Sequence, residues 1–178
     1  LPGHRDADNA GHRAEVADYW GVDSLPANAG LSAVELFEAV RTGGIKAIWI
    51  ACTNPAQSMP NQTLIHEALV ACPFVVVQEA FFTTETCRYA DLLLPAASWG
   101  EKEGTVTNSE RRISHVRSAV PAPGQARADW AIVCDFARRL ERQLRPGLPS
   151  LFGFSSPAEI FDEYKQLTTG QWQCALCQ

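Results

Sequence analysis

Polar side chains follow three short apolar runs of the sequence, at positions where they could contact a ligand. The runs cover residues 45–52, 74–77 and 91–94 and are predicted strands, the first of which has the pattern of a strand buried on both faces of a parallel sheet. In an open α/β sheet, ligands bind outside the carboxyl ends of the strands. The loops after the three runs are therefore the candidate binding loops. They hold Cys52, Thr53, Asn54 and Pro55, then Gln78, Glu79, Thr83, Thr84 and Thr86, and finally residues 95–102.

These side chains have the chemistry of a nucleotide site. An amide such as Asn54 can donate to a phosphate or sugar oxygen. A carboxylate such as Glu79 can accept from two ribose hydroxyls, or from the N1 and N2 donors of guanine. Turn formation is the competing interpretation, because Asn-Pro starts turns and acidic residues commonly follow strands. The pattern alone leaves both interpretations open.

A concentration of charge lies at residues 101–112, EKEGTVTNSERR. Its cations could neutralise a pyrophosphate, whereas such clusters are more often solvated surfaces with paired ions. The motifs GxGxxG, GxxxxGKS/T, HExxH and GxSxG are absent, so the sequence shows no catalytic machinery of its own. Cys174 and Cys177 form a single CxxC, which lacks the further ligands of a zinc or iron–sulfur site. We therefore predict a binding domain with no catalytic and no metal-ligating residue.

Composition narrows the class of protein. Of the 178 residues, 46% are hydrophobic and 20% are charged, so the chain can bury one sizeable core. The formal net charge of −5 argues against a nucleic-acid partner. No apolar stretch approaches the roughly 18 to 20 residues that span a bilayer, so no membrane is expected. The six cysteines lie mostly in apolar segments, which favours a reducing, cytoplasmic compartment. The chain starts at Leu1 in a polar loop and looks excised from something longer.

The elements between the candidate loops predict an α/β fold. A capping box of Ser32 and Glu35 starts a helix at 33–42, and a second amphipathic helix fits 63–71. With the flanking strands, the second helix makes a βαβ unit with a right-handed crossover. We expect a three-layer Rossmann-like domain with a mostly parallel sheet. Residues 105–120 alternate loosely between polar and apolar, as an extended β-ribbon arm would.

Two further helices are expected in the C-terminal third of the chain. One begins at Asp129, with an apolar face that should point inward and an arginine face that should point outward. The apolar face holds Trp130, Val133, Phe136 and Leu140, and the arginine face holds Arg138, Arg139 and Arg142. The other helix, at about 157–167, follows a capping box of Ser156 and Glu159.

Three segments resemble the molybdopterin oxidoreductase family, and within it the assimilatory nitrate reductases. They are IACTNPAQSMPN at 50–61, the segment from VVVQEAFF to SERRIS at 75–114, and PAPGQARADW at 121–130. The occurrence of TNP, TET, ADLLLPA, EKEGT and NSERR in this order is specific. The resemblance extends to about Gly170.

The resemblance implies an internal or C-terminal-half fragment of a large catalytic subunit that reduces nitrate to nitrite. Such a subunit carries molybdenum on a bis-molybdopterin guanine dinucleotide cofactor (bis-MGD), together with a 4Fe–4S cluster. Matched by motif, the cofactor contacts here are Asn54, Gln78, Glu79, Lys102 and Asp129, where Glu79 replaces a more common Asp. The cysteines that hold the cluster and the metal belong to parts of the family chain upstream of Leu1. The fragment alone is expected to be inactive, and its partners are the remainder of the subunit and an electron-donor protein.

The expected organisation follows from these assignments. Residues 1–31 form an irregular N-terminal segment, 32–144 the dinucleotide-binding α/β domain with its ribbon arm, and 145–178 a linker and terminal helix. Two alternatives stay open. One is the equivalent domain of a related enzyme such as formate dehydrogenase, because substrate choice depends on residues around the metal. The other is a stand-alone nucleotide-binding or interaction module.

Overall fold

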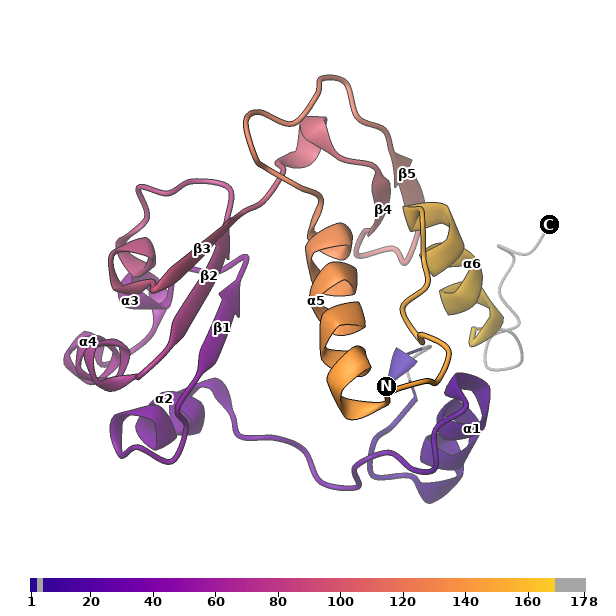
Figure 1. The fold of residues 1–178 in the computed structure, drawn as a ribbon, viewed down its shortest axis with the longest axis horizontal. Helices are drawn as coiled ribbons and strands as arrows, with labels where there is room; N and C mark the ends of the chain where they lie inside the picture. Colours follow the sequence, from indigo (N-terminus) through magenta and orange to yellow (C-terminus); the bar gives the residue numbers. More distant parts are fainter. Residues whose placement is uncertain (3–4, 169–178) are drawn as a thin grey trace. The chain divides into compact units, whose positions relative to one another are not determined.

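The chain folds into two compact units in a computed structural model, which describes residues 1–2 and 5–168 (Figure 1). Unit 1 comprises Leu1–Gly30, Gly104–Ser114 and Val133–Gln178, and unit 2 comprises Leu31–Glu103 and His115–Ile132. The candidate binding loops all belong to unit 2. The CxxC of Cys174 and Cys177 lies outside the described residues.

Unit 2 is built on a parallel sheet of three strands, in the order β1 (Ile48–Ala51), β2 (Val75–Glu79) and β3 (Leu92–Pro95). The register pairs Ala51 with Gln78, and Glu79 with Pro95. The carboxyl ends of all three strands therefore meet at one edge, as predicted. The first strand is shorter than the predicted 45–52, and Gln78 and Glu79, predicted to lie in the following loop, are the last two residues of β2.

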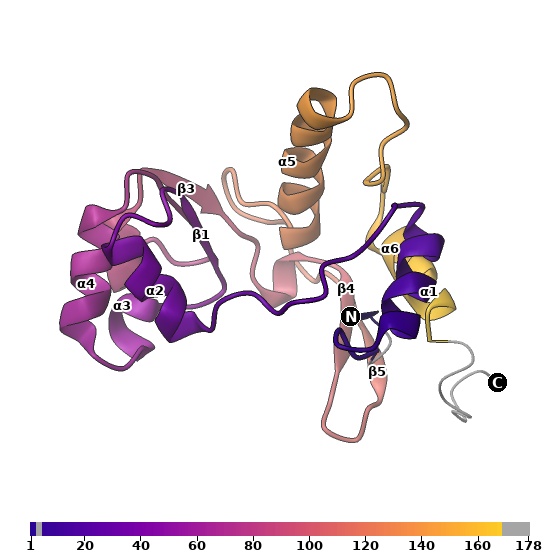
Figure 2. The same ribbon diagram turned by 90° about the horizontal axis from the view of Figure 1, so that it is seen from below.

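Helices α2 (Ala33–Arg41) and α4 (Gln62–Ala71) pack against each other in unit 2, on one side of the sheet (Figures 1 and 2). The predicted capping box starts α2: Ser32 Oγ accepts from the Glu35 amide at 3.4 Å, and the Glu35 carboxylate accepts from the Ser32 amide at 2.8 Å. A short helix α3 (Pro55–Ser58), which was not predicted, is separated from the end of β1 by three residues. The predicted βαβ core is confirmed.

The core of unit 2 lies between the sheet and these helices. Alternate strand residues Ile48, Ile50, Val75 and Val77 are buried, together with Phe37, Val40, Ile65, Ala68 and Leu69 from α2 and α4. Burying each large apolar side chain contributes about 1.5 to 3 kcal/mol. On the opposite face of the strands, Trp49 and Val76 are half-buried. The α/β class with its parallel sheet is thus confirmed, and unit 2 supplies the sheet and one helical layer of the expected three.

Two short 3₁₀ helices and an extended segment complete the carboxyl edge. Helix η2 (Glu85–Tyr89) connects β2 to β3, and η3 (Trp99–Glu101) follows β3. The chain later returns to this edge, where the Arg127 amide donates to the Pro95 carbonyl at 3.0 Å and the Ala97 amide donates to the Arg127 carbonyl at 2.8 Å. These bonds place the start of helix α5 (Asp129–Leu144) beside the end of β3.

The N-terminal segment of unit 1, predicted to be irregular, contains helix α1 (Ala10–Trp20). Asn9 caps it, because its side-chain oxygen accepts from the amides of Gly11 and His12 at 2.9 and 3.2 Å. Only Val16 and Ala17 of this helix are buried. The apolar period is therefore too weak to reveal the helix in the sequence.

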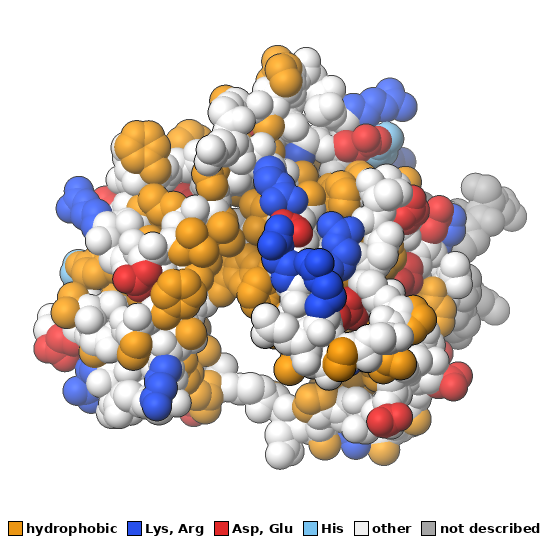
Figure 3. Space-filling model, viewed as in Figure 1, with side chains coloured by type: hydrophobic (Ala, Val, Ile, Leu, Met, Phe, Trp, Pro, Cys, Tyr) orange, Lys and Arg blue, Asp and Glu red, His pale blue; other side chains and the backbone are white. Residues whose placement is uncertain are grey.

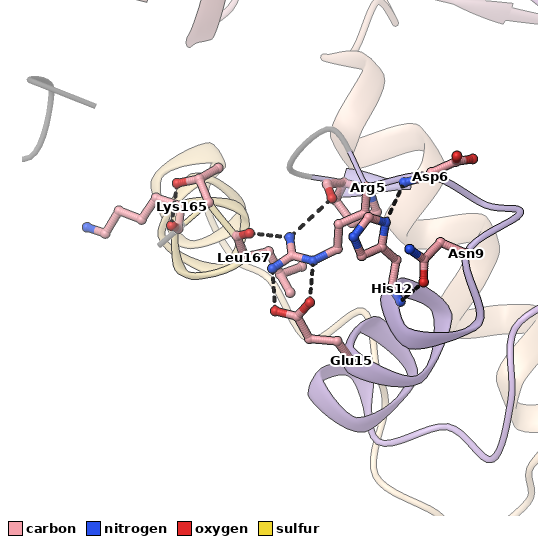
Figure 4. A network of polar contacts seen from close by, with 9 residues as sticks. Arg5, Asp6, Asn9, His12, Glu15, Lys165 and Leu167 are labelled. Carbon is pink, nitrogen blue, oxygen red and sulfur yellow. Dashed lines mark hydrogen bonds and ion pairs between the residues drawn. The ribbon is translucent and has the colours of Figure 1, made fainter. Parts of the chain in front are cut away.

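Arg5 joins this N-terminal segment to the end of helix α6 (Pro157–Gln166), as Figure 4 shows. Its side chain is only 1% exposed and forms an ion pair with Glu15 at 2.5 Å. The guanidinium also donates to the backbone carbonyl of Leu167. Tyr19 Oη donates to the Glu163 carbonyl at 3.2 Å, so α1 and α6 are linked at two places.

The predicted ribbon arm is a two-stranded sheet of β4 (Gly104–Thr107) and β5 (Ile113–Val116). Helix α6 begins as predicted, but its capping box is half formed. Ser156 Oγ accepts from the Glu159 amide at 3.3 Å, whereas the Glu159 carboxylate reaches the Ser155 amide, one residue earlier, at 2.8 Å. No described helix is long and apolar enough to cross a membrane.

The orientation predicted for α5 is partly wrong. Val133, Phe136 and Leu140 are 45%, 50% and 40% exposed, whereas Ile132 and Cys134 are buried. The 3.6-residue period identifies the side chains that share a face, but it does not determine how far that face is buried. Arg139 and Arg142 are exposed as predicted, and basic side chains gather over α5 in Figure 3.

Candidate functional site at the sheet edge

The Asp129 carboxylate gathers three side chains at the carboxyl edge of the sheet. Its Oδ1 atom accepts from Gln78 Nε2 at 2.7 Å, and its Oδ2 atom pairs with Lys102 Nζ at 2.5 Å. Cys52 Sγ lies 3.9 Å from Oδ1. Four parts of the chain therefore meet at this carboxylate. They are the end of β1, the end of β2, the residue after η3 and the first residue of α5. Gln78, Lys102 and Asp129 were all predicted as site residues.

Asp129 is an ionised carboxylate in a partly enclosed setting, with 29% of its side chain exposed. Burial raises the pKa of Asp129, but hydrogen bonds from Lys102 and Gln78 and the charge of Lys102 together lower it below its ordinary value. Lys102 Nζ also lies 5.5 Å from the centre of the Trp99 ring, a cation–π distance. The ionised carboxylate of Asp129 is thus held against the Lys102 side chain.

Gln78 presents a buried acceptor that has no hydrogen-bond partner among the described residues. The side chain is 2% exposed, and its Oε1 atom is unpaired. The orientation of the amide is fixed, because a flipped amide would place its oxygen against the acceptor-only carboxylate of Asp129. A buried acceptor without a partner costs about 1 to 3 kcal/mol. The acceptor capacity of Oε1 is therefore unused within the described residues.

Cys52 belongs to this group, although the sequence interpretation named it only as part of a candidate loop. It has a φ of 59°, a left-handed conformation that non-glycine residues rarely adopt. Burial and then the negative charge of Asp129 raise the pKa of the Cys52 thiol, against the opposing effect of Lys102. The thiol therefore stands beside the carboxylate in its neutral form.

Asn54, another predicted site residue, has its side chain fully engaged by η2 and α3. Its Oδ1 atom accepts from the Thr86 amide at 3.1 Å and from Thr86 Oγ1 at 2.6 Å. Its Nδ2 atom donates to Glu85 Oε2 at 2.7 Å and to Gln57 Oε1 at 3.1 Å. Both donor hydrogens and both acceptor positions are used. The TNP and TET motifs are thus joined to each other.

Glu79 also has partners of its own. Its Oε1 atom accepts from the amides of Ala80 and Phe81 at 2.7 and 3.4 Å, which stabilises the turn after β2. The described residues show no hydrogen bond from Glu79 or Asn54 to the Asp129 carboxylate. The edge therefore divides into a group around Asp129 and a group around Asn54. Thr86 and Glu85 of the second group were missed as site residues, although the TET motif contains both.

Residues 4–139 match the family model described as molybdopterin oxidoreductase. The chain belongs to the molybdopterin oxidoreductase family. Membership implies a molybdenum–pterin cofactor, and the free acceptor of Gln78 beside an ionised carboxylate and a lysine fits a cofactor with donor and anionic groups. Within the described part of the chain, no three His, Cys, Asp or Glu residues are grouped so as to hold a metal ion.

The chain is similar to nitrate reductases over most of its length. It is 45% identical over 153 residues to the nitrate reductase of Klebsiella oxytoca, covering 86% of this chain and 17% of that protein. It is 41% identical over 172 residues to the assimilatory nitrate reductase catalytic subunit of Bacillus subtilis (strain 168), covering 96% of this chain and 23% of that protein. The chain thus spans about a fifth of the length of these relatives.

A solved structure supports the fold. Acetylene hydratase from Pelobacter acetylenicus aligns with a TM-score of 0.62 at 24% identity, covering 76% of this chain and 18% of that chain. At this identity the likeness shows the fold alone.

Proposed function

We propose that this chain is the part of a molybdenum-dependent nitrate reductase that binds a guanine nucleotide end of bis-MGD. The observation that carries the proposal is the unpaired Oε1 atom of Gln78, which is buried beside the Asp129 carboxylate. The guanine ring offers N1–H and N2–H donors on one edge. An amide oxygen and a carboxylate side by side are suited to accept from such a pair.

The same two groups select guanine over adenine. Adenine presents an acceptor at N1, which would face the acceptor atoms of Gln78 and Asp129. Mismatched acceptors leave buried polar groups unpaired, which is costly. Lys102, held 2.5 Å from Asp129, supplies a positive charge near the anionic part of a dinucleotide. Glu79 completes the proposed contact set, whereas Asn54, whose side chain is fully engaged within the protein, contributes to the site by shaping the edge.

The activity belongs to the larger catalytic subunit. When bound, the molybdenum cofactor supplies oxygen-atom transfer, by which nitrate becomes nitrite. We infer that the 4Fe–4S cluster and the metal ligand come from other parts of that subunit, with an electron-donor protein as its partner and a cytoplasmic location. In this chain, residues 32–144 would form the dinucleotide-binding domain. Relatives at 45% and 41% identity carry nitrate reductase names, which favours nitrate over formate.

The test uses the parent subunit purified with its cofactor. Gln78→Met keeps the side-chain volume but removes both polar atoms. We expect cofactor content, measured as guanine nucleotide released on denaturation, to fall between about fivefold and a hundredfold at limiting cofactor. Gln143→Met, at an exposed position of α5, is the matched control and should leave the content unchanged. Full guanine nucleotide content in Gln78→Met would refute the proposal.

A further inference from the structure

Thr86 is a fully buried polar residue at the centre of the Asn54 group, with no exposed surface. Its hydroxyl donates to Asn54 Oδ1 at 2.6 Å and accepts from the Ala56 amide at 3.1 Å. Its own amide donates to the same Asn54 oxygen at 3.1 Å. The Thr86 side chain in η2 therefore forms hydrogen bonds with two residues that follow β1, Asn54 and Ala56.

That turn contains the strained residue of the edge. Cys52, at a φ of 59°, is the first residue after β1. Such a conformation persists only where the surrounding structure fixes it. On one side of Cys52, its amide donates to the Gln78 carbonyl at 3.3 Å. On the other side, two residues along, the Asn54 side chain is held by Thr86 and Glu85.

We propose that Thr86 is a positioning residue, which acts through Asn54 to hold the turn after β1 so that Cys52 stays against the Asp129 carboxylate. The inference rests on the proposed function only in that this carboxylate belongs to the nucleotide site. Among the described residues, Thr86 forms no hydrogen bond with Cys52 or Asp129. Its influence on the site passes through the backbone of residues 52–54.

The Cys52 thiol reports the position of the turn. Against Asp129, burial and the neighbouring negative charge raise its pKa, so the reactive thiolate is scarce. Cys52 is exposed, so relaxation of the turn would act mainly by moving the thiol away from the carboxylate, and its pKa would fall toward the ordinary value. Its rate of alkylation should then rise. A change in global stability alone would leave that native-state rate and its pH dependence unchanged.

The experiment measures iodoacetamide alkylation of this chain under native conditions, quantified on the peptide that contains Cys52. Thr86→Val keeps the shape but removes the hydroxyl. We expect the Cys52 rate to rise about tenfold, with its pH midpoint shifted down, because the loop loses hydrogen bonds that hold it closed. Thr86→Ser restores the hydroxyl and should return the rate to the parent value. Thr83→Val, at an exposed position of the same loop, is the matched control.

A second variant decides the matter if Thr86→Val does not fold. Glu85→Ala removes the acceptor of Asn54 Nδ2 from a partly exposed position, and we expect the Cys52 rate to rise about threefold. A folded variant of either kind with the parent rate and pH midpoint would overturn the positioning role. That result would leave the nucleotide proposal standing, because the latter depends on the cofactor content of Gln78→Met.

Discussion

Gln78 Nε2 donates to Asp129 Oδ1 at 2.7 Å, which ties the end of β2 to the first residue of α5 across 51 positions of the chain. The bond fixes the orientation of the Gln78 amide and leaves Oε1 as the free acceptor. Asp129 therefore does more than begin a helix. It organises the polar groups of the edge that we assign to the nucleotide.

Asp129→Ala in the parent subunit separates this role from helix capping. An acidic residue in the first turn also complements the helix dipole, and losing it should lower the stability of the apo form by about 1 kcal/mol. Loss of a partly buried acceptor for guanine should lower cofactor occupancy by about tenfold or more. Molybdenum analysis and thermal melting of the apo form measure the two effects.

Asp135→Ala, on the same helix, is the control for this prediction, since Asp135 pairs with Arg139 on the exposed surface. We expect it to leave occupancy unchanged. If Asp129→Ala melts markedly lower as the apo form but holds the parent level of cofactor, then Asp129 serves only the helix.

Lys102→Met should change how stability depends on pH. In the parent chain the folded-state pKa of Asp129 is below its ordinary value. The ionised carboxylate therefore stabilises the folded state above the ordinary pKa, and this contribution is lost as the pH falls through the folded-state pKa. Without Lys102, burial raises the pKa of Asp129 against weaker opposition. The stability deficit of the variant should then be greatest, about 1 kcal/mol, at neutral pH and shrink on acidification.

Urea unfolding of the parent chain and of the Lys102→Met variant between about pH 7 and pH 3 measures this deficit. Lys165→Met provides the control, because Lys165 and Asp162 form a pair whose side chains are 56% and 59% exposed. Its deficit should be small at every pH. A deficit of Lys102→Met that stays constant across the range would show that the Asp129 charge is not what Lys102 stabilises.

Arg5 and Glu15 should respond unequally to substitution. The Arg5 side chain is 1% exposed and that of Glu15 is 52% exposed. Glu15→Ala leaves a buried guanidinium with backbone carbonyls as its remaining acceptors, whereas Arg5→Met leaves a hydrated carboxylate. We expect amide hydrogen exchange in α6 to accelerate about tenfold in Glu15→Ala and about threefold in Arg5→Met.

Arg41→Met is the control for the Arg5 pair, since Arg41 and Glu38 are 39% and 49% exposed. Exchange in α6 should not change in this variant. If Glu15→Ala and Arg5→Met accelerate exchange equally, then the unpaired buried charge of Arg5 is not what destabilises the Glu15→Ala variant.

The purified chain should contain no stoichiometric molybdenum and reduce no nitrate. The described residues offer no group of three metal-type ligands, and one edge of a sheet cannot enclose a two-pterin centre. Metal analysis by mass spectrometry and a nitrite assay test this, with the parent subunit as the positive control. About one molybdenum per chain would contradict it.

Local patterns in the sequence determined much of unit 2. The strands and helices α2 and α4 follow from continuous apolar runs, helical period and cap chemistry, all of which act over a few residues. The shared edge followed as well, because parallel strands end on the same side. Even the residue types of the site were predictable, since polar side chains directly follow buried strands. By contrast, α1 was missed because its apolar period is weak and its start depends on the Asn9 cap.

Only the tertiary structure decided which polar groups pair with one another. Asp129 meets Lys102 and Gln78 across 27 and 51 positions, and Asn54 meets Thr86 across 32, so no local pattern encodes these contacts. Gln78 and Asn54 both carry an amide, but Gln78 keeps a free acceptor and Asn54 keeps none. Each outcome depends on what surrounds the side chain. The sequence by itself thus determined the residues available at the edge, and packing determined which of them remain free to bind.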